Sequence, residues 1–173
     1  MVLKSIELIG FKSFAKKTEL TFNVPVTAIV GPNGSGKSNV VEAIRFVLGE
    51  QSIKSLRGKG GSDMIFKGSK LLSPMSRAKV SIVFDNKEKL FRIDKNSESK
   101  LSVDFDEVVI SREVFSDGSN EYRINNTVVR LKDVLEILAG VNIGSSGHHI
   151  ISQGEADRLL TANSRDRRGM VED

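Results

Sequence analysis

The chain has 173 residues with 26 basic and 22 acidic side chains, a net charge of +4, and its length fits one domain. It contains no run approaching the roughly 18 apolar residues of a membrane-spanning helix, and its first residues lack the apolar core of a signal peptide. The absence of cysteine excludes disulfides, thiolate metal sites and cysteine nucleophiles. We therefore expect a soluble intracellular domain without a membrane partner.

The N-terminal third predicts three strands followed by a helix. Residues 2–9 and 18–23 alternate apolar and polar side chains, which is typical of half-buried strands. Residues 26–30 (VTAIV) are apolar without alternation, which favours a strand covered on both faces in a parallel sheet. Helical spacing of apolar residues follows over 37–48, and Gly49 stands where a C-terminal cap is expected.

The remainder predicts an antiparallel meander and a short amphipathic helix. Asp117-Gly118 and Asn125-Asn126 are turn signals, and they join segments that have strand character. The expected strands are 78–85, 107–115, 121–125 and the TVVR segment at 127–130. The expected later elements are a helix at 131–140, a strand at 148–152 and a charged helix at 155–173. Exposed loops are predicted at 68–77 and 94–104.

Residues 31–38 (GPNGSGKS) match the phosphate-loop pattern G-x-x-x-x-G-K-[ST]. Glycines let the backbone wrap closely around phosphates, and the N-terminus of the following helix adds free N–H groups. Lys37 would bridge the β- and γ-phosphates, and the Ser38 hydroxyl would bind Mg²⁺. A glycine-rich turn could match by chance, but the predicted strand before the loop and helix after it favour a phosphate site.

Hydrolysis needs a further acidic residue at the end of another apolar strand. The one run resembling such a strand ends at Asp85, but it alternates as a half-exposed strand does. We therefore interpret Asp85 as closing an antiparallel strand rather than as a magnesium ligand. A phosphate-loop strand normally has parallel neighbours, and this chain offers few candidates for them. We therefore also predict that the sheet has an unfilled edge, which a partner segment would cover.

Five stretches together carry a resemblance to a known family: IELIGFKSFAKKTEL, VTAIVGPNGSGKSNVVEAIRFVLGEQSIKSLRG, DMIFKGS, YRINNTVVRLKDVLEIL and IISQGEADRLL followed by RDRRGMVED. They resemble the N-terminal half of the ATPase head of prokaryotic, condensin-type SMC (structural maintenance of chromosomes) proteins. The resemblance implies an α/β P-loop NTPase, an ABC-ATPase-like (SMC/RecF-type) half-head with an antiparallel β lobe at 78–130. It places all of residues 1–173 in that half-head, with a coiled coil beginning near residue 166.

The resemblance also implies roles for individual residues. Residues 32–39 would bind the nucleotide: Pro32, Asn33, Gly34, Ser35, Gly36, Lys37, Ser38 and Asn39. Lys12 and Ser13 would lie near its base and ribose. Gln153 would contact Mg²⁺ and the attacking water, and Arg57 would reach the nucleotide, so that Lys37, Gln153 and Arg57 form the catalytic set. The acidic magnesium strand, the catalytic glutamate and the signature motif would belong to a C-terminal half.

A chain of this family would bind ATP and Mg²⁺ and act in chromosome condensation and segregation, in the cytoplasm on the nucleoid. Its implied partners are the C-terminal half of the head, a second SMC head in a homodimer, a kleisin-type subunit and DNA. Residues 94–104 look like an insertion, which leaves any DNA contact there open, and the RRGMVED ending departs from the family pattern at the neck of the coiled coil.

Other interpretations stay open at this point. A RecN- or RecF-type DNA-repair ATPase would share the split head, and an ATP-binding module without turnover would share the loop. A small P-loop kinase would need a parallel βα series, which the predicted meander disfavours. His148-His149 is not predicted to bind a metal, because neighbours in a strand point to opposite faces. The basic residues Lys54, Arg57 and Lys59 could contact DNA phosphates or simply be solvated.

Overall fold

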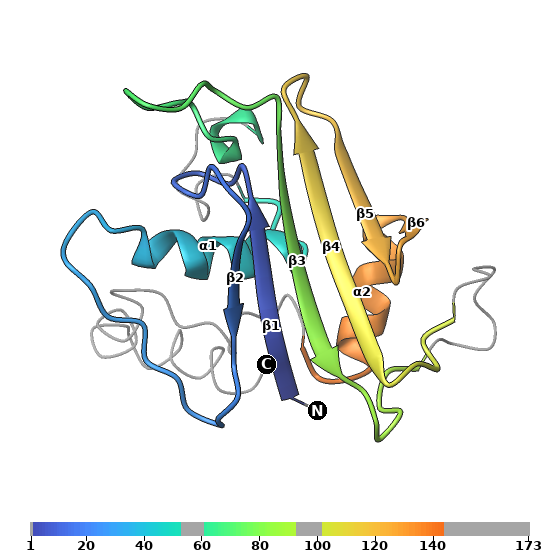
Figure 1. The fold of residues 1–173 in the computed structure, drawn as a ribbon. Coiled ribbons are helices and arrows are strands. Elements are labelled where there is room, and N and C mark those ends of the chain that lie inside the picture. Colours follow the sequence, from blue (N-terminus) through green and yellow to red (C-terminus); the bar gives the residue numbers. More distant parts are fainter. Residues whose placement is uncertain (1, 53–60, 93–101, 144–173) are drawn as a thin grey trace, which may run out of the picture.

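The computed structural model describes residues 2–52, 61–92 and 102–143. Within these ranges six strands form one antiparallel sheet in the order β2-β1-β3-β4-β5-β6 (Figure 1). The strands are β1 (Val2–Ile9), β2 (Thr18–Thr21), β3 (Arg77–Asp85), β4 (Glu107–Phe115), β5 (Asn120–Ile124) and β6 (Thr127–Val129). The helices are α1 (Lys37–Val47) and α2 (Leu131–Ala139), with a 3₁₀ turn η1 at Gly61–Met64. No helix in the described ranges has the length and hydrophobicity to cross a bilayer.

The predicted meander is confirmed, and its turns form where the sequence placed them. Gly118 takes a φ of +86° between β4 and β5. Asn125 and Asn126 take φ values of +47° and +67° between β5 and β6, as a two-residue hairpin with left-handed central residues requires. The turn residues therefore fix the register of β4, β5 and β6.

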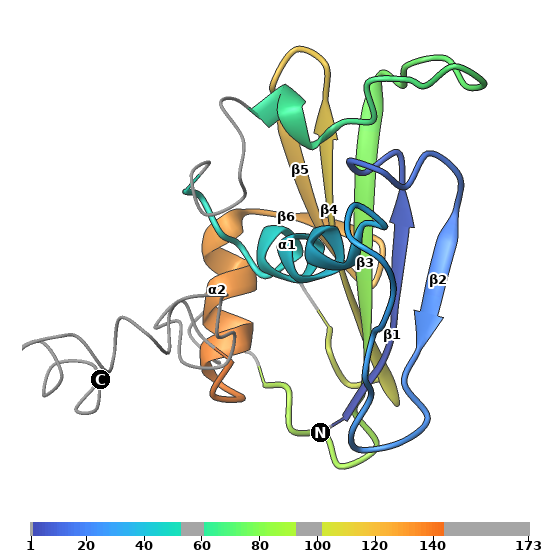
Figure 2. The same cartoon turned by 90° about the vertical axis from the view of Figure 1, so that its left-hand side faces the viewer.

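Both helices lie on one face of the sheet, and the core fills the space between (Figure 2). Alternate residues of the strands point into it, so that Ile82, Ile110 and Ile124 are almost completely buried. Phe46 from α1 enters the same core and packs against Phe11, with ring centroids 5.3 Å apart. Each fully buried side chain of this size contributes about 1.5–3 kcal/mol. Phe14 and Phe22 are half-buried against this core.

The predicted strand at 26–30 is wrong for the structure described. This segment forms no strand, and its side chains face solvent: Val26 is 87% and Val30 is 88% exposed. An extended backbone becomes a strand only when a neighbour satisfies its N–H and C=O groups, and none of the described strands lies beside it. The apolar composition was identified correctly, but the described sheet is antiparallel and supplies no parallel neighbours.

The start of α2 is held by the side chain of Asp133. Asp133 accepts a hydrogen bond of 2.8 Å from the backbone N–H of Arg130, the residue before the helix. Burial acts to raise the pKa of Asp133, but the hydrogen bonds from Arg130 outweigh it, so the pKa lies below its usual value. This carboxylate therefore stabilises the fold in its ionised form.

Replacing Asp133 by alanine should lower the free energy of unfolding by about 1 kcal/mol at pH 7, because the cap is lost. Since the folded pKa is depressed, the stabilisation is present above the unfolded pKa of about 3.9 and disappears as the pH falls through the folded value. Urea unfolding of both proteins at pH 7 and pH 3 measures this. A difference that stayed constant between the two pH values would contradict the assignment to the ionised carboxylate.

Candidate nucleotide-binding site

The loop at 31–38 has the backbone shape that anion binding needs. Gly34 and Gly36 take φ values of +81° and +94°, in the left-handed region that favours glycine. Gly36 is the N-cap of α1, and no side chain caps the helix there. The first N–H groups of α1 are therefore available to a ligand, together with the positive end of the helix dipole.

Lys37 folds back over this loop. Its ammonium donates hydrogen bonds of 2.7 Å to the carbonyl oxygens of Gly31 and Pro32. These two contacts hold a positive charge across the loop, from which the ammonium can turn to phosphate oxygens. Ser38 follows in the first turn of α1 and is exposed, so its hydroxyl is accessible.

The turn after β1 forms one wall of the site, because Ser13 contacts both the loop and the helix. The Asn39 side-chain amide donates a 2.8 Å hydrogen bond to the Ser13 hydroxyl. A Cβ atom on Gly36 would lie only 2.7 Å from that same hydroxyl oxygen. Only glycine therefore fits at position 36 while Ser13 keeps this position. Three of the predicted site residues thus meet at the N-terminal end of α1.

Lys12 lies beside this wall, but its ammonium faces α1. It forms an ion pair with Glu42, and the two side chains are 13% and 6% exposed. The pair ties the turn after β1 to the middle of the helix. Sequence patterns missed Glu42, because a charged residue next to an apolar stripe is normally solvated. Removing one member of such a buried pair typically costs about 3–5 kcal/mol.

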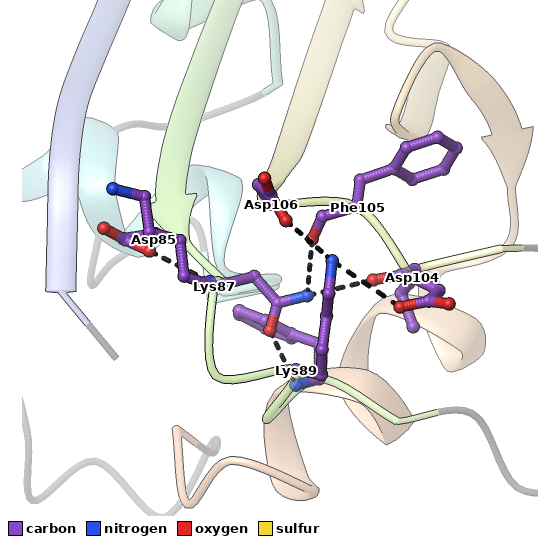
Figure 3. Close-up of polar contacts among 9 residues, drawn as sticks. Asp85, Lys87, Lys89, Asp104, Phe105 and Asp106 are labelled. Atoms are coloured by element: carbon purple, nitrogen blue, oxygen red, sulfur yellow. Dashed lines mark hydrogen bonds and ion pairs between the residues drawn. The ribbon is translucent and has the colours of Figure 1, made fainter.

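Asp85 lies at the far end of the sheet from Ser13. In the antiparallel pairing of β1 with β3, Asp85 is opposite Val2, whereas Ser13 follows the other end of β1. The Asp85 carboxylate accepts a 3.0 Å hydrogen bond from the backbone N–H of Lys87 (Figure 3). The structure thus confirms that Asp85 closes an antiparallel strand.

The chain around this end of β3 is held by its own polar contacts. Lys89 lies 2.8 Å from Asp106 and 3.5 Å from Asp104, and its hydrogen bond lowers the pKa of Asp106 (Figure 3). The buried amide of Asn86 donates to the carbonyl oxygens of Val103 and Phe105, each at 2.9 Å. No group of three or more His, Cys, Asp or Glu within the described ranges could hold a metal ion.

Arg112 on β4 connects the sheet to the other end of α1. It is only 6% exposed, and one guanidinium nitrogen donates to the carbonyl oxygens of Phe46 at 2.9 Å and Glu50 at 2.8 Å. Its guanidinium carbon lies 4.1 Å from the Phe46 ring centroid and 4.9 Å from that of Tyr122. Sequence reasoning missed Arg112, although a charged residue at an inward-facing position of an alternating strand was an available signal.

Several predicted residues lie outside the described ranges. These are Arg57 and Gln153 of the expected catalytic set, the neighbouring Lys54 and Lys59, the pair His148-His149, the strand at 148–152 and the helix at 155–173. Most of the 94–104 loop lies outside them as well.

A glycine-rich anion loop at the start of a helix that packs on a β-sheet defines a phosphate-loop nucleotide-binding domain. Residues 2–162 match the family described as the RecF/RecN/SMC N terminal domain, and the chain belongs to this family. The expected fold class is confirmed: an SMC/RecF-type ATPase head, of which this antiparallel sheet with few helices is consistent with the N-terminal half.

Curated relatives and solved structures agree with this assignment. The chain is 47% identical to the chromosome partition protein Smc of Rhodopirellula baltica over 99% of its own length and 14% of that protein. It superposes with a TM-score of 0.88 and 38% identity on a structure described under ATP-driven dimerisation and DNA-stimulated activation of SMC ATPases, covering 99% of this chain and 98% of that one. A structure of an Smc head bound to the C-winged helix domain of ScpA superposes with a TM-score of 0.89 and 39% identity, covering 100% of this chain and 51% of that one. The chain thus spans about one seventh of the curated relative's length.

Proposed function

We propose that this chain is the ATP-binding half of the head of a chromosome-organising ATPase. The observation that carries the proposal is the loop at 31–38, where left-handed glycines, the open N-terminus of α1 and the ammonium of Lys37 converge. The identity to chromosome partition proteins supports the chromosomal role over a DNA-repair role. In this proposal the head binds ATP, pairs with a second head and hydrolyses ATP to ADP and phosphate.

The described residues would divide the work on ATP between them. The backbone N–H groups of the loop and Lys37 would bind the phosphates and stabilise the charge that develops as the γ-phosphate departs. Ser13 and Asn39, already joined at 2.8 Å, would form the wall on which the rest of the nucleotide lies. Lys12 would hold that wall in place through its ion pair with Glu42. Lys12 is also proposed to lie near the base and ribose of the nucleotide.

Mg²⁺ suits the hydroxyl of Ser38, an exposed hard oxygen beside Lys37, and when bound the ion would neutralise phosphate charge. Gln153 is proposed as a second oxygen ligand that orients the attacking water, and Arg57 as a further contact to the nucleotide. The catalytic set would therefore be Lys37, Gln153 and Arg57.

Turnover would require a C-terminal half of the head. Among the described strands, β3 is the one that ends in an acidic residue, Asp85, and this residue lies at the far end of the sheet from Ser13. The exposed apolar residues of 24–30 provide a surface on which strands of such a half could pair, notably Val26 and Val30. We propose that residues 1–173 form one half-head, with the antiparallel lobe at 78–130 and a coiled coil from about residue 166.

The proposed partners follow from the same relatives. The solved neighbours include a head bound to ScpA, so a kleisin-type subunit is proposed for this head, together with a second copy of it and DNA. The site of action would be the nucleoid in the cytoplasm.

The test is ATP turnover by this chain alone and after mixing with the C-terminal head segment of its parent gene. We expect no turnover by the chain alone and turnover on mixing, measured as phosphate release, with binding of a fluorescent ATP analogue followed in parallel. Turnover by the chain alone would contradict the split-head proposal. Analogue binding without turnover in the mixture would favour the alternative, an ATP-binding module without its own activity. The position of Asp85, far from the loop, is compatible with that alternative as well.

A further inference from the structure

The N-terminal end of α1 forms the proposed nucleotide site, and its C-terminal end is held by a buried arginine, Arg112. The helix is 11 residues long, so about 16 Å separate its two ends. At the first end the turn after β1 contacts the helix through Ser13 and Lys12. At the other end Arg112 reaches from the sheet to the carbonyl oxygen of Phe46 in the last turn and to that of Glu50 just beyond the helix.

Arg112 contacts the end of α1 through hydrogen bonds and through ring packing. Its two hydrogen bonds to Phe46 and Glu50 span the point where the helix stops, and Gly49 lies between these residues with a φ of +100°. A third hydrogen bond, from Nε to the Asn120 side chain at 3.0 Å, ties the guanidinium to the β4–β5 hairpin. The guanidinium also packs over the rings of Phe46 and Tyr122, which adds contacts that hold its orientation.

The chain after α1 is tied to the same cluster. Gln51 donates a 3.0 Å hydrogen bond to the Tyr122 hydroxyl and a 3.2 Å bond to the Gly49 carbonyl oxygen. The β4–β5 hairpin therefore holds both the end of α1 and the first residues that follow it.

Burying the guanidinium of Arg112 at this position carries a desolvation penalty. Among the described residues its hydrogen-bond acceptors are two backbone carbonyls and an amide oxygen, all neutral. Burial lowers the pKa of Arg112, although an arginine stays charged near neutral pH. An apolar residue of similar volume would avoid the desolvation penalty. What an apolar residue could not supply is a charged nitrogen that donates to two carbonyl oxygens at the end of the helix, where a cation is also favoured by the dipole, and a second donor fixed to Asn120.

We infer that Arg112 is a positioning residue for the nucleotide site: it sets the direction of α1, and thereby the placement of Lys37 and Ser38 against groups from the rest of the head. The inference rests on the proposed ATPase function. If the C-terminal end of α1 is released, the whole helix can shift on the sheet, while the loop keeps its own N–H groups and still binds phosphates. The alignment of the loop with groups contributed from outside the chain is lost, so the chemical step suffers more than binding.

The experiment uses the complete head and compares Arg112→Met and Arg112→Lys with the control Arg123→Met. Arg123 lies on the neighbouring strand β5, directly across from Ser111, and its side chain pairs with Glu121 and not with α1. Nucleotide-binding sites are titrated with a fluorescent ATP analogue, and kcat is expressed per titrated site. Amide hydrogen exchange at Gly49 and Glu50 reports the helix end directly.

We expect Arg112→Met to lower kcat per titrated site by about 10- to 100-fold, as a small misplacement of catalytic groups does, while the analogue affinity changes far less. Exchange at Gly49 and Glu50 should accelerate, and Arg112→Lys should recover part of kcat because the cation is retained. Arg123→Met should match the wild type in all three measurements.

Activity that falls only in proportion to the number of titrated sites would overturn the inference, because Arg112 would then act on folding alone. An unchanged kcat in Arg112→Lys together with faster exchange would overturn it too, since the helix end would be loose without consequence. If Arg112→Met does not fold, the Arg112→Lys comparison still decides. A wild-type head that binds no analogue would instead contradict the proposed function.

Discussion

Replacing Lys37 by methionine in the complete head should reduce ATP turnover by about 10²- to 10³-fold, the loss typical of removing one preorganised donor to developing charge. Lys37 is the ammonium held across the loop by the carbonyl oxygens of Gly31 and Pro32. Methionine keeps the length of the side chain but donates no hydrogen bond and carries no charge. Phosphate release per head measures the effect, and analogue binding should weaken as well.

The matched control is Lys70→Met, at an exposed lysine of the loop before β3. Both substitutions remove one positive charge, so a nonspecific effect of net charge on the nucleotide would appear in both. We expect Lys70→Met to retain wild-type turnover, and neither variant to change the free energy of unfolding by more than about 0.5 kcal/mol. Equal losses of turnover in the two variants would contradict a specific role for Lys37.

Replacing Phe46 by alanine should lower the free energy of unfolding by about 3–5 kcal/mol, because it leaves a cavity at the centre of the core. Phe46 is 1% exposed, contacts Phe11 and lies under the guanidinium of Arg112. Its loss therefore removes the packing of α1 against both Phe11 and Arg112. Since domains have only about 5–15 kcal/mol of stability in total, much of the margin would disappear.

The control for Phe46 is Phe105→Ala, at a phenylalanine that is 53% exposed. Phe105 contributes a carbonyl oxygen to Asn86, and this backbone contact survives the substitution. Urea unfolding of both variants should show a large shift for Phe46→Ala and a shift within about 0.5 kcal/mol for Phe105→Ala. Similar shifts would mean that the region around Phe46 relaxes and fills the cavity.

Local patterns predicted most of the described elements because their causes are local. The turns at Gly118 and at Asn125-Asn126 depend on residues that accept positive φ, and such residues are visible in a sequence. Alternation over β3 and β4 reflects one face on the core, which the sequence also records. The phosphate loop could likewise be predicted from the sequence, because its glycines and Lys37 stand at fixed spacings within one short segment.

The strand predicted at 26–30 does not form in the described structure, because strand formation depends on a partner segment and not on local residues alone. Its apolar composition was real, but a strand is a relation between two segments, and the described ranges contain no neighbour for this one. Composition alone cannot say whether the segment that would complete a strand lies in the same chain.

By itself the sequence determined the anion loop, the helix that follows it, the hairpin turns and the family to which the chain belongs, because each depends on residue types at fixed short spacings. Only the tertiary structure decided that Ser13 contacts Asn39, that Lys12 is turned to Glu42, and that Arg112 donates to the Phe46 carbonyl oxygen at the end of α1. These contacts join residues that are 26, 30 and 66 positions apart. Such pairs follow from how the sheet packs on the helix, and that packing is a property of the whole core rather than of any local pattern.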